Sequence, residues 1–191
     1  MPGRQAKLIT PSVLRGMLSH VRHSRSPKRD RVIILLSVKA GMRAAEIAQL
    51  DWSMVLDVRG QINDTIALHD AIAKKRSGRR IPMHQDLRQA LSALSQQSNP
   101  RGPVIRSARG GAMRPNSIVN WFVQLFAELG LDGCSSHSGR RTFVTVAARN
   151  AHRAGCSLRD VQLLAGHRSI ETTQRYIDGD TRGQRKLVSL L

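Results

Sequence analysis

The chain has 191 residues, a length that suits one domain or at most two very small ones. Hydrophobic residues make up 40% of the sequence, which is ordinary for a globular protein that buries its own core without a metal or a disulfide. The 31 Lys and Arg residues outnumber the 13 Asp and Glu residues, and the net charge of +18 excludes an acidic ligand-buffering protein and indicates a polyanionic partner.

Helical patterns dominate the first fifty residues. A Thr-Pro pair is a typical helix start, so a helix is expected from Pro11 to about His20. A second helix is expected from Pro27 to a stop at Gly41, and a shorter one through Glu46–Leu50.

The apolar period changes between Met54 and His84, where apolar and polar residues alternate as they do in strands. Turns are expected at Arg59-Gly60 and at Ser77-Gly78, so this segment predicts an antiparallel sheet of two or three strands. The helical period then returns, and helices are expected at about 86–97, 115–129, 137–154, 158–165, 170–177 and 184–190. The predicted fold class is mainly α with a small antiparallel β-sheet (α+β).

Two basic segments, 23–31 and 98–114, lie between these elements. Both contain Arg together with Ser, Pro or Gly, which predicts loops, and the second is expected to be exposed.

The composition also indicates which kind of nucleic acid the protein binds and in which cell compartment it is expected. Three Phe, two Trp and one Tyr are few for a protein that stacks on single-stranded bases, whereas many Arg residues suit the phosphate backbone of duplex DNA. The longest uncharged apolar run, 32–38, is too short to span a bilayer, and no secretory leader follows Met1. Cys134 and Cys156 lack zinc-finger spacing and are expected as reduced thiols of a cytoplasmic, nucleoid-associated protein.

The C-terminal region carries the first candidate chemistry. His167 follows Gly166, which is expected to end one helix, and Tyr176 comes nine residues after His167. On one continuous helix these two side chains would lie on opposite faces, but a break at Gly166 allows both to reach one site. Taken alone, the segment also fits a capped surface helix with a half-buried Tyr.

Three further candidate motifs precede this C-terminal segment in the chain. His137 and Arg140 are spaced to share a helix face, and Arg43 is placed to start a helix with Glu46 three residues later as an ion-pair partner. Lys74 is expected at the lip of the β-turn. Each piece alone also suits a solvated surface.

In this order and spacing, the pieces resemble the tyrosine recombinases, or phage-type integrases, over residues 10–185. The resemblance covers the catalytic domain of that family. It implies that Lys74, with Lys75 as the near alternative, is the hairpin lysine and that Glu46 is structural. The catalytic residues that it implies are Arg43, Lys74, His137, Arg140, His167 and Tyr176.

The resemblance implies site-specific cutting and rejoining of duplex DNA through a 3′-phosphotyrosyl intermediate. A phenol ionises only near pH 10, so Tyr176 needs activation, while Arg43 and Arg140 suit the charge on the scissile phosphate. Lys74 would protonate the leaving 5′ oxygen. No metal, ATP or other cofactor is expected. The alternatives are a topoisomerase of the 3′-phosphotyrosyl type and a non-catalytic protein that binds duplex DNA.

The sequence departs from the family at Gly139, where many relatives carry Leu, and at Arg141, where many carry His. Only 42 residues precede Arg43, whereas the clamp domain usual in the family needs at least about 50 of its own. We therefore expect residues 1–191 to form a single catalytic domain without that clamp, and the sequence leaves open whether an accessory DNA-binding protein supplies the clamp or it has been removed. The resemblance also implies a free monomer that assembles as a tetramer on paired sites, with the tail 182–191 exchanged between protomers.

Overall fold

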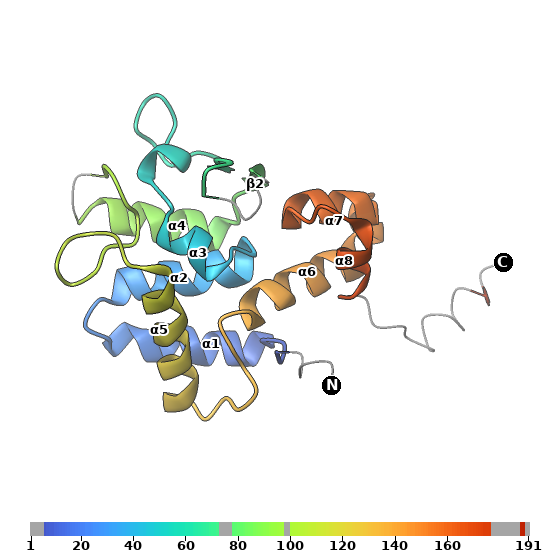
Figure 1. Ribbon diagram of the computed structural model, residues 1–191, viewed down its shortest axis with the longest axis horizontal. Helices are drawn as coiled ribbons and strands as arrows, with labels where there is room; N and C mark the ends of the chain where they lie inside the picture. The colour runs from blue at the N-terminus through green and yellow to red at the C-terminus, as the bar shows by residue number, and fades with distance from the viewer. Residues whose placement is uncertain (1–5, 73–77, 98–99, 177–187, 190–191) are drawn as a thin grey trace. The chain divides into compact units, whose positions relative to one another are not determined.

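The computed structural model describes residues 6–72, 78–97, 100–176 and 188–189. The chain divides into two compact units, Met1–Phe143 and Val144–Leu191, and the division falls inside helix α6 (Ser138–Asn150). Most described residues are helical, and the sheet is small, as the sequence predicted (Figure 1).

Helix α2 (Pro27–Lys39) is the centre of the first unit. Its residues from Val32 to Leu36 have no exposed surface, because helices α1 (Pro11–His20), α3 (Ala44–Ala48) and α4 (Gln85–Ser95) pack on it (Figure 1). A helix covered on several sides is apolar all round, which explains the uninterrupted apolar run in the sequence. The predicted start and end of this helix are confirmed.

Helix α3 (Ala44–Ala48) begins directly after Arg43 and packs against helix α5 (Pro115–Glu128). It ends two residues before the expected end at Leu50. The short 3₁₀ helix η2 (Trp52–Met54) follows, with the Asp51 side chain accepting a hydrogen bond from the Ser53 backbone at its start.

The sheet has two antiparallel strands, β1 (Thr65–Leu68) and β2 (Arg79–Pro82). Ile66 pairs with Ile81, and both side chains are buried. A third strand is not formed in the described part of this region, where Leu56 and Ile62 make a single isolated bridge. The turn that carries Lys74 and Lys75 lies outside the described residues.

The basic segment 98–114 is anchored more firmly than expected. Val104 and Ile105 are buried, and the Val104 amide donates to the Leu50 carbonyl. An isolated bridge joins Arg106 and Ala112. Only part of this segment is therefore exposed, because its apolar residues complete the core beside η2.

The second unit contains the end of α6, the 3₁₀ helix η3 (His152–Ala154), and helices α7 (Leu158–Ala165) and α8 (Ile170–Gln174). The helix expected over 137–154 ends at Asn150, and Gly155, with a φ of 66°, reverses the chain after η3. The helix expected over 170–177 ends at Gln174. The helix expected over 184–190 lies almost wholly outside the described residues.

Within the described ranges, none of the helices combines the length and the apolar composition that crossing a membrane requires.

Candidate active site

Arg43 stands at the N-cap of α3, where the sequence places a helix start. The Glu46 carboxylate accepts hydrogen bonds from the Arg43 backbone amide at 2.9 Å and from its Nη1 at 2.7 Å. The ion pair predicted from the i, i+3 spacing is thus confirmed. It holds the Arg43 side chain, which is 21% exposed, in a defined orientation.

Glu46 also binds a second arginine. Arg79 Nη1 and Nη2 donate to the two Glu46 oxygens at 3.0 and 3.1 Å, in the bidentate geometry that guanidinium favours. Burial raises the pKa of Glu46, but hydrogen bonds and the charges of Arg79 and Arg43 outweigh it and lower that pKa from 4.5 to about 2. One ionised carboxylate therefore orients two guanidinium groups.

Sequence reasoning missed Arg79 as a contributor to this site. It begins β2, where its side chain is 5% exposed, and Ile81, two residues on, is buried as well. Residues two apart on a strand share a face, so the buried Ile81 predicts an inward Arg79. An inward arginine needs a buried carboxylate, and Glu46 is that group.

Arg140, near the start of α6, is 4% exposed, and its Nη1 donates to the Gly41 carbonyl at 2.7 Å. Gly41 lies two residues before Arg43, so this hydrogen bond brings the two predicted arginines to the same loop. Gly41 has a φ of 62°, and a Cβ there would overlap the Phe143 ring, so the position requires glycine.

His137 is exposed and lies just before the first residue of α6 rather than within it. Its carbonyl accepts the Arg141 amide at 2.9 Å, which places it at the helix entry, one turn before that residue. His137, Arg140 and Arg43 all belong to the first unit, together with Glu46 and Arg79.

His167 and Tyr176 both lie in the second unit and contact each other. Gly166, with a φ of 61°, ends α7, and the His167 amide donates to the Gln162 carbonyl, as in a Schellman motif. The His167 and Tyr176 rings stack with centroids 5.5 Å apart. The predicted break at Gly166 is confirmed.

The sequence predicted that Tyr176 lies within the helix over 170–177. Helix α8 instead ends at Gln174, and Tyr176 lies just after it. The Tyr176 amide donates to the Thr173 carbonyl at 3.0 Å, a three-residue turn that closes α8. Thr173 also bonds His167 Nδ1 at 2.9 Å and is fully buried. These bonds fix the imidazole orientation and the backbone that carries the phenol.

The predicted hairpin lysine and the question of a metal site remain. Lys74 and its alternative Lys75 lie outside the described residues. Across the described ranges, no three His, Cys, Asp or Glu side chains gather as metal ligands would.

Comparison with known protein families shows to which family the chain belongs. The model of the phage integrase family matches residues 7–182, which is most of the chain. The chain belongs to the phage integrase family. This membership confirms the resemblance seen in the sequence.

The chain is similar to proteins named as tyrosine recombinases. The chain is 29% identical over 157 residues to the tyrosine recombinase XerC of Rhodospirillum centenum, covering 80% of this chain and 43% of that protein. It is 32% identical over 157 residues to XerC of Lactobacillus delbrueckii subsp. bulgaricus, covering 78% of this chain and 50% of that one. The chain therefore spans about half the length of these relatives.

Solved structures share the fold. The integrase of transposon Tn1549, bound to a circular intermediate DNA, superposes with a TM-score of 0.75 at 19% identity, covering all of this chain and 67% of that one. The XerH recombinase bound to a palindromic difH substrate gives 0.74 at 19% identity, covering 99% and 54%. The predicted α+β fold class is confirmed.

Proposed function

We propose that this member of the phage integrase family is the strand-cutting part of a site-specific DNA recombinase. Its substrate is duplex DNA, and its intermediate is a 3′-phosphotyrosyl bond to Tyr176. The observation that carries the proposal is the joint placement of two arginines: Arg140 donates to the Gly41 carbonyl two residues before Arg43, and the buried Glu46 orients Arg43. The family relatives are named as recombinases rather than topoisomerases, which favours this proposal over the alternatives.

The two arginines bind the scissile phosphate in this mechanism. Guanidinium forks match the non-bridging oxygens and stay charged at every working pH, so they stabilise the negative charge that develops as the phosphorus becomes five-coordinate. Arg140 is buried and held by Gly41, and Arg43 is held by Glu46, so both charges are oriented before DNA binds.

The phenol oxygen of Tyr176 attacks the phosphorus, and the bond to the 5′ oxygen breaks. His137 is assigned to accept the phenol proton or orient the phosphate, and its exposed position at the start of α6 leaves it accessible to a substrate. His167 is assigned to donate a hydrogen bond to a phosphate oxygen. Its ring orientation is fixed by Thr173.

Lys74, or Lys75 in its place, is assigned to protonate the leaving 5′ oxygen. The phosphotyrosyl bond conserves the energy of the cleaved phosphodiester, so the 5′ hydroxyl of another strand can reverse the reaction and rejoin the DNA. None of these roles calls on ATP, a metal or another cofactor.

Substitution of the nucleophile tests the proposal. Tyr176→Phe removes the attacking oxygen, and Tyr176 is the only Tyr in the chain, so covalent attachment to DNA should be lost. The measurement is capture of denaturation-resistant protein–DNA adducts from nicked duplex fragments, followed by sequencing of the attached DNA. Duplex affinity, measured by fluorescence anisotropy, is the control and should be nearly unchanged. An adduct formed by the Phe variant would refute the assignment.

A further inference from the structure

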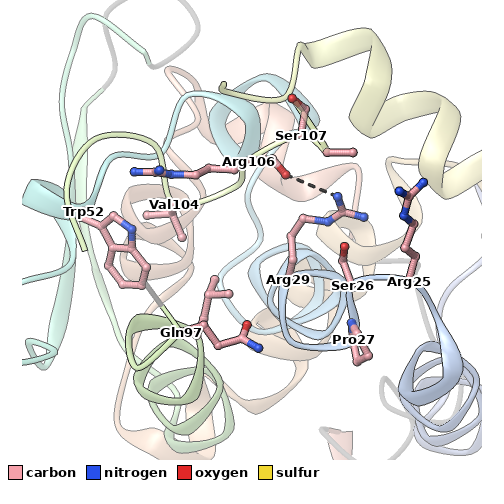
Figure 2. Close-up of a pocket in the computed structure, with 11 residues that line it drawn as sticks. Arg25, Ser26, Pro27, Arg29, Trp52, Gln97, Val104, Arg106 and Ser107 are labelled. Atoms are coloured by element: carbon pink, nitrogen blue, oxygen red, sulfur yellow. Dashed lines mark hydrogen bonds between the residues drawn. The ribbon is translucent and has the colours of Figure 1, made fainter. Parts of the chain in front are cut away.

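A pocket of about 320 Å³ lies in the first unit, where α2 begins. Helix α2 has 13 residues, so this pocket is roughly 20 Å from the end of α2 that precedes Arg43. The two basic segments of the sequence meet here, because Arg29 Nη1 donates to the Arg106 carbonyl at 3.4 Å (Figure 2).

Arginines line this pocket, and none of its described lining residues is acidic. Arg29 is fixed by Asp30, whose buried carboxylate accepts its Nε at 2.8 Å and also the Ser24 hydroxyl at 2.7 Å. Arg25 and Arg106 also line the pocket, so its net charge stays positive after Asp30 neutralises one guanidinium.

The start of α2 adds to this potential. Ser26 is the N-cap and lines the pocket, but its side chain makes no capping hydrogen bond in the described structure. The first backbone amides of a helix lack partners within that helix, and the helix dipole favours an anion there.

Trp52 supplies an independent observation. The residue as a whole is 2% exposed, and its indole N–H makes no hydrogen bond to any part of the chain that the structure describes. The ring lines the pocket, with its nitrogen toward the interior (Figure 2). An indole N–H usually finds a hydrogen-bond acceptor, so this donor, on a ring that lines the pocket, is available to a ligand oxygen.

We propose that this pocket binds a phosphate group, with Arg25, Arg29 and the start of α2 holding its charge and Trp52 donating a hydrogen bond. Pockets of this volume accept one small ligand, and the apolar side of the lining, Leu94 and Val104, leaves space for an attached sugar. The phosphate belongs either to a free nucleotide or to the backbone of bound DNA. Only the second source rests on the proposed function.

The test is the indole N–H resonance of Trp52 in the full chain. Only two Trp are present, so Trp121→Phe assigns the Trp52 signal. The probes are inorganic phosphate, a nucleoside monophosphate and a short blunt duplex, each against sodium chloride of equal ionic strength. Tyr176→Phe protein is used throughout, so that cleavage plays no part.

We expect a saturable shift of the Trp52 resonance with at least one phosphate probe and none with chloride. Arg25→Gln should weaken that binding roughly tenfold, since one charge-assisted contact is lost. Arg59→Gln removes an exposed arginine from a turn that does not line the pocket and is the matched control, with unchanged affinity expected.

The probes separate the two sources. A shift with the mononucleotide supports a free ligand, whereas a shift with the duplex alone supports a backbone phosphate. The proposal is wrong if no probe moves the Trp52 resonance, or if Arg25→Gln and Arg59→Gln weaken the response equally. If the Trp52 resonance shifts with a phosphate probe but the parent chain, which keeps Tyr176, forms no covalent adduct with DNA, this proposal stands and the proposed function is refuted.

Discussion

Glu46 is the residue on which the charge arrangement of the first unit depends. It is 1% exposed, and its two oxygens accept hydrogen bonds from Arg43 and Arg79. A single negative charge between two positive ones leaves a net charge of +1, which suits a site that binds an anion. It also means that Arg43 and Arg79 compete for the same carboxylate.

Arg79 should therefore be a positioning residue for Arg43. In Arg79→Gln, Glu46 loses its bidentate partner and draws more strongly on the Arg43 guanidinium, so the single-turnover cleavage rate should fall about tenfold or more. Arg79→Lys should recover only part of that rate, because lysine cannot form the two parallel bonds. Rates are measured at saturating DNA and well below the melting temperature, because breaking a buried pair also costs about 3–5 kcal/mol of stability.

Arg88→Gln is the matched control for Arg79, because the ion pair between Arg88 and Asp64 is exposed on both sides. Its cleavage rate and stability should stay near those of the parent. If Arg79→Gln cleaves as fast as Arg88→Gln once both are fully folded, Arg79 is structural only.

Glu46 also predicts a pH dependence of stability. Its pKa is lowered from 4.5 to about 2 on folding, so the ionised form stabilises the native state above about pH 4.5. That contribution, on the order of 3 kcal/mol, is lost progressively as the pH falls from about 4.5 towards 2. Urea unfolding of the parent and Glu46→Gln should show a stability difference that is constant above pH 5 and shrinks below it. A difference that stays constant down to pH 3 would contradict the assignment.

At the scale of elements, α2 and α6 approach each other closely at one point. Gly139 faces Ser37, which is fully buried and whose hydroxyl has no partner among the described residues. A Cβ on Gly139 would overlap the Ser37 hydroxyl and lie 2.9 Å from the Ser37 Cβ. A side chain at position 139 would therefore meet Ser37 directly.

Gly139→Ala should therefore lower the free energy of unfolding by about 1–3 kcal/mol, despite the better helix propensity of Ala. Ser37→Gly in the same chain should restore part of the loss, because it removes the atoms that the new methyl group meets. Thermal or urea unfolding measures both. Gly16→Ala in α1 is the control, since nothing lies within 4 Å of a Cβ there. Equal stability of the Gly139 and Gly16 variants would show that the helices can move apart at no cost.

At the scale of the whole molecule, the question is what the C-terminal tail, residues 182–191, packs against. Most of residues 182–191 lie outside the described residues, but Val188 is described and is 68% exposed. The tail carries Leu187, Val188, Leu190 and Leu191, and so short an apolar segment cannot fold alone. We propose that it docks on a neighbouring protomer when the protein assembles as a tetramer on paired DNA sites.

Deletion of residues 183–191 should leave binding to a single site intact and reduce cooperative binding to paired sites, measured by native gel and sedimentation on the captured DNA. Val58→Ser, which changes a fully exposed Val elsewhere, is the control and should assemble normally. If the deleted protein assembles on paired sites as well as the parent does, the tail packs on its own protomer.

The sequence by itself determined the order of the helices, the place of the hairpin and the family. Helix starts such as Pro11 and Pro27 and stops such as Gly41 act within a few residues, so they can be found without the fold. The pair of Arg43 and Glu46 was predictable for the same reason. The end of α8 before Tyr176 was not predictable from the sequence. It depends on the hydrogen bonds that Thr173 makes with His167 and with the Tyr176 amide.

Only the tertiary structure decided which distant residues meet. Arg79 and Glu46 are 33 residues apart, Arg29 and Arg106 are 77 apart, and Arg140 and Gly41 are 99 apart. Charge and periodicity show that such residues face inward or outward, but not which partner each finds. That choice follows from the packing of α2 with its neighbours, because burying a charged group is favourable only where the fold places a partner within hydrogen-bond distance.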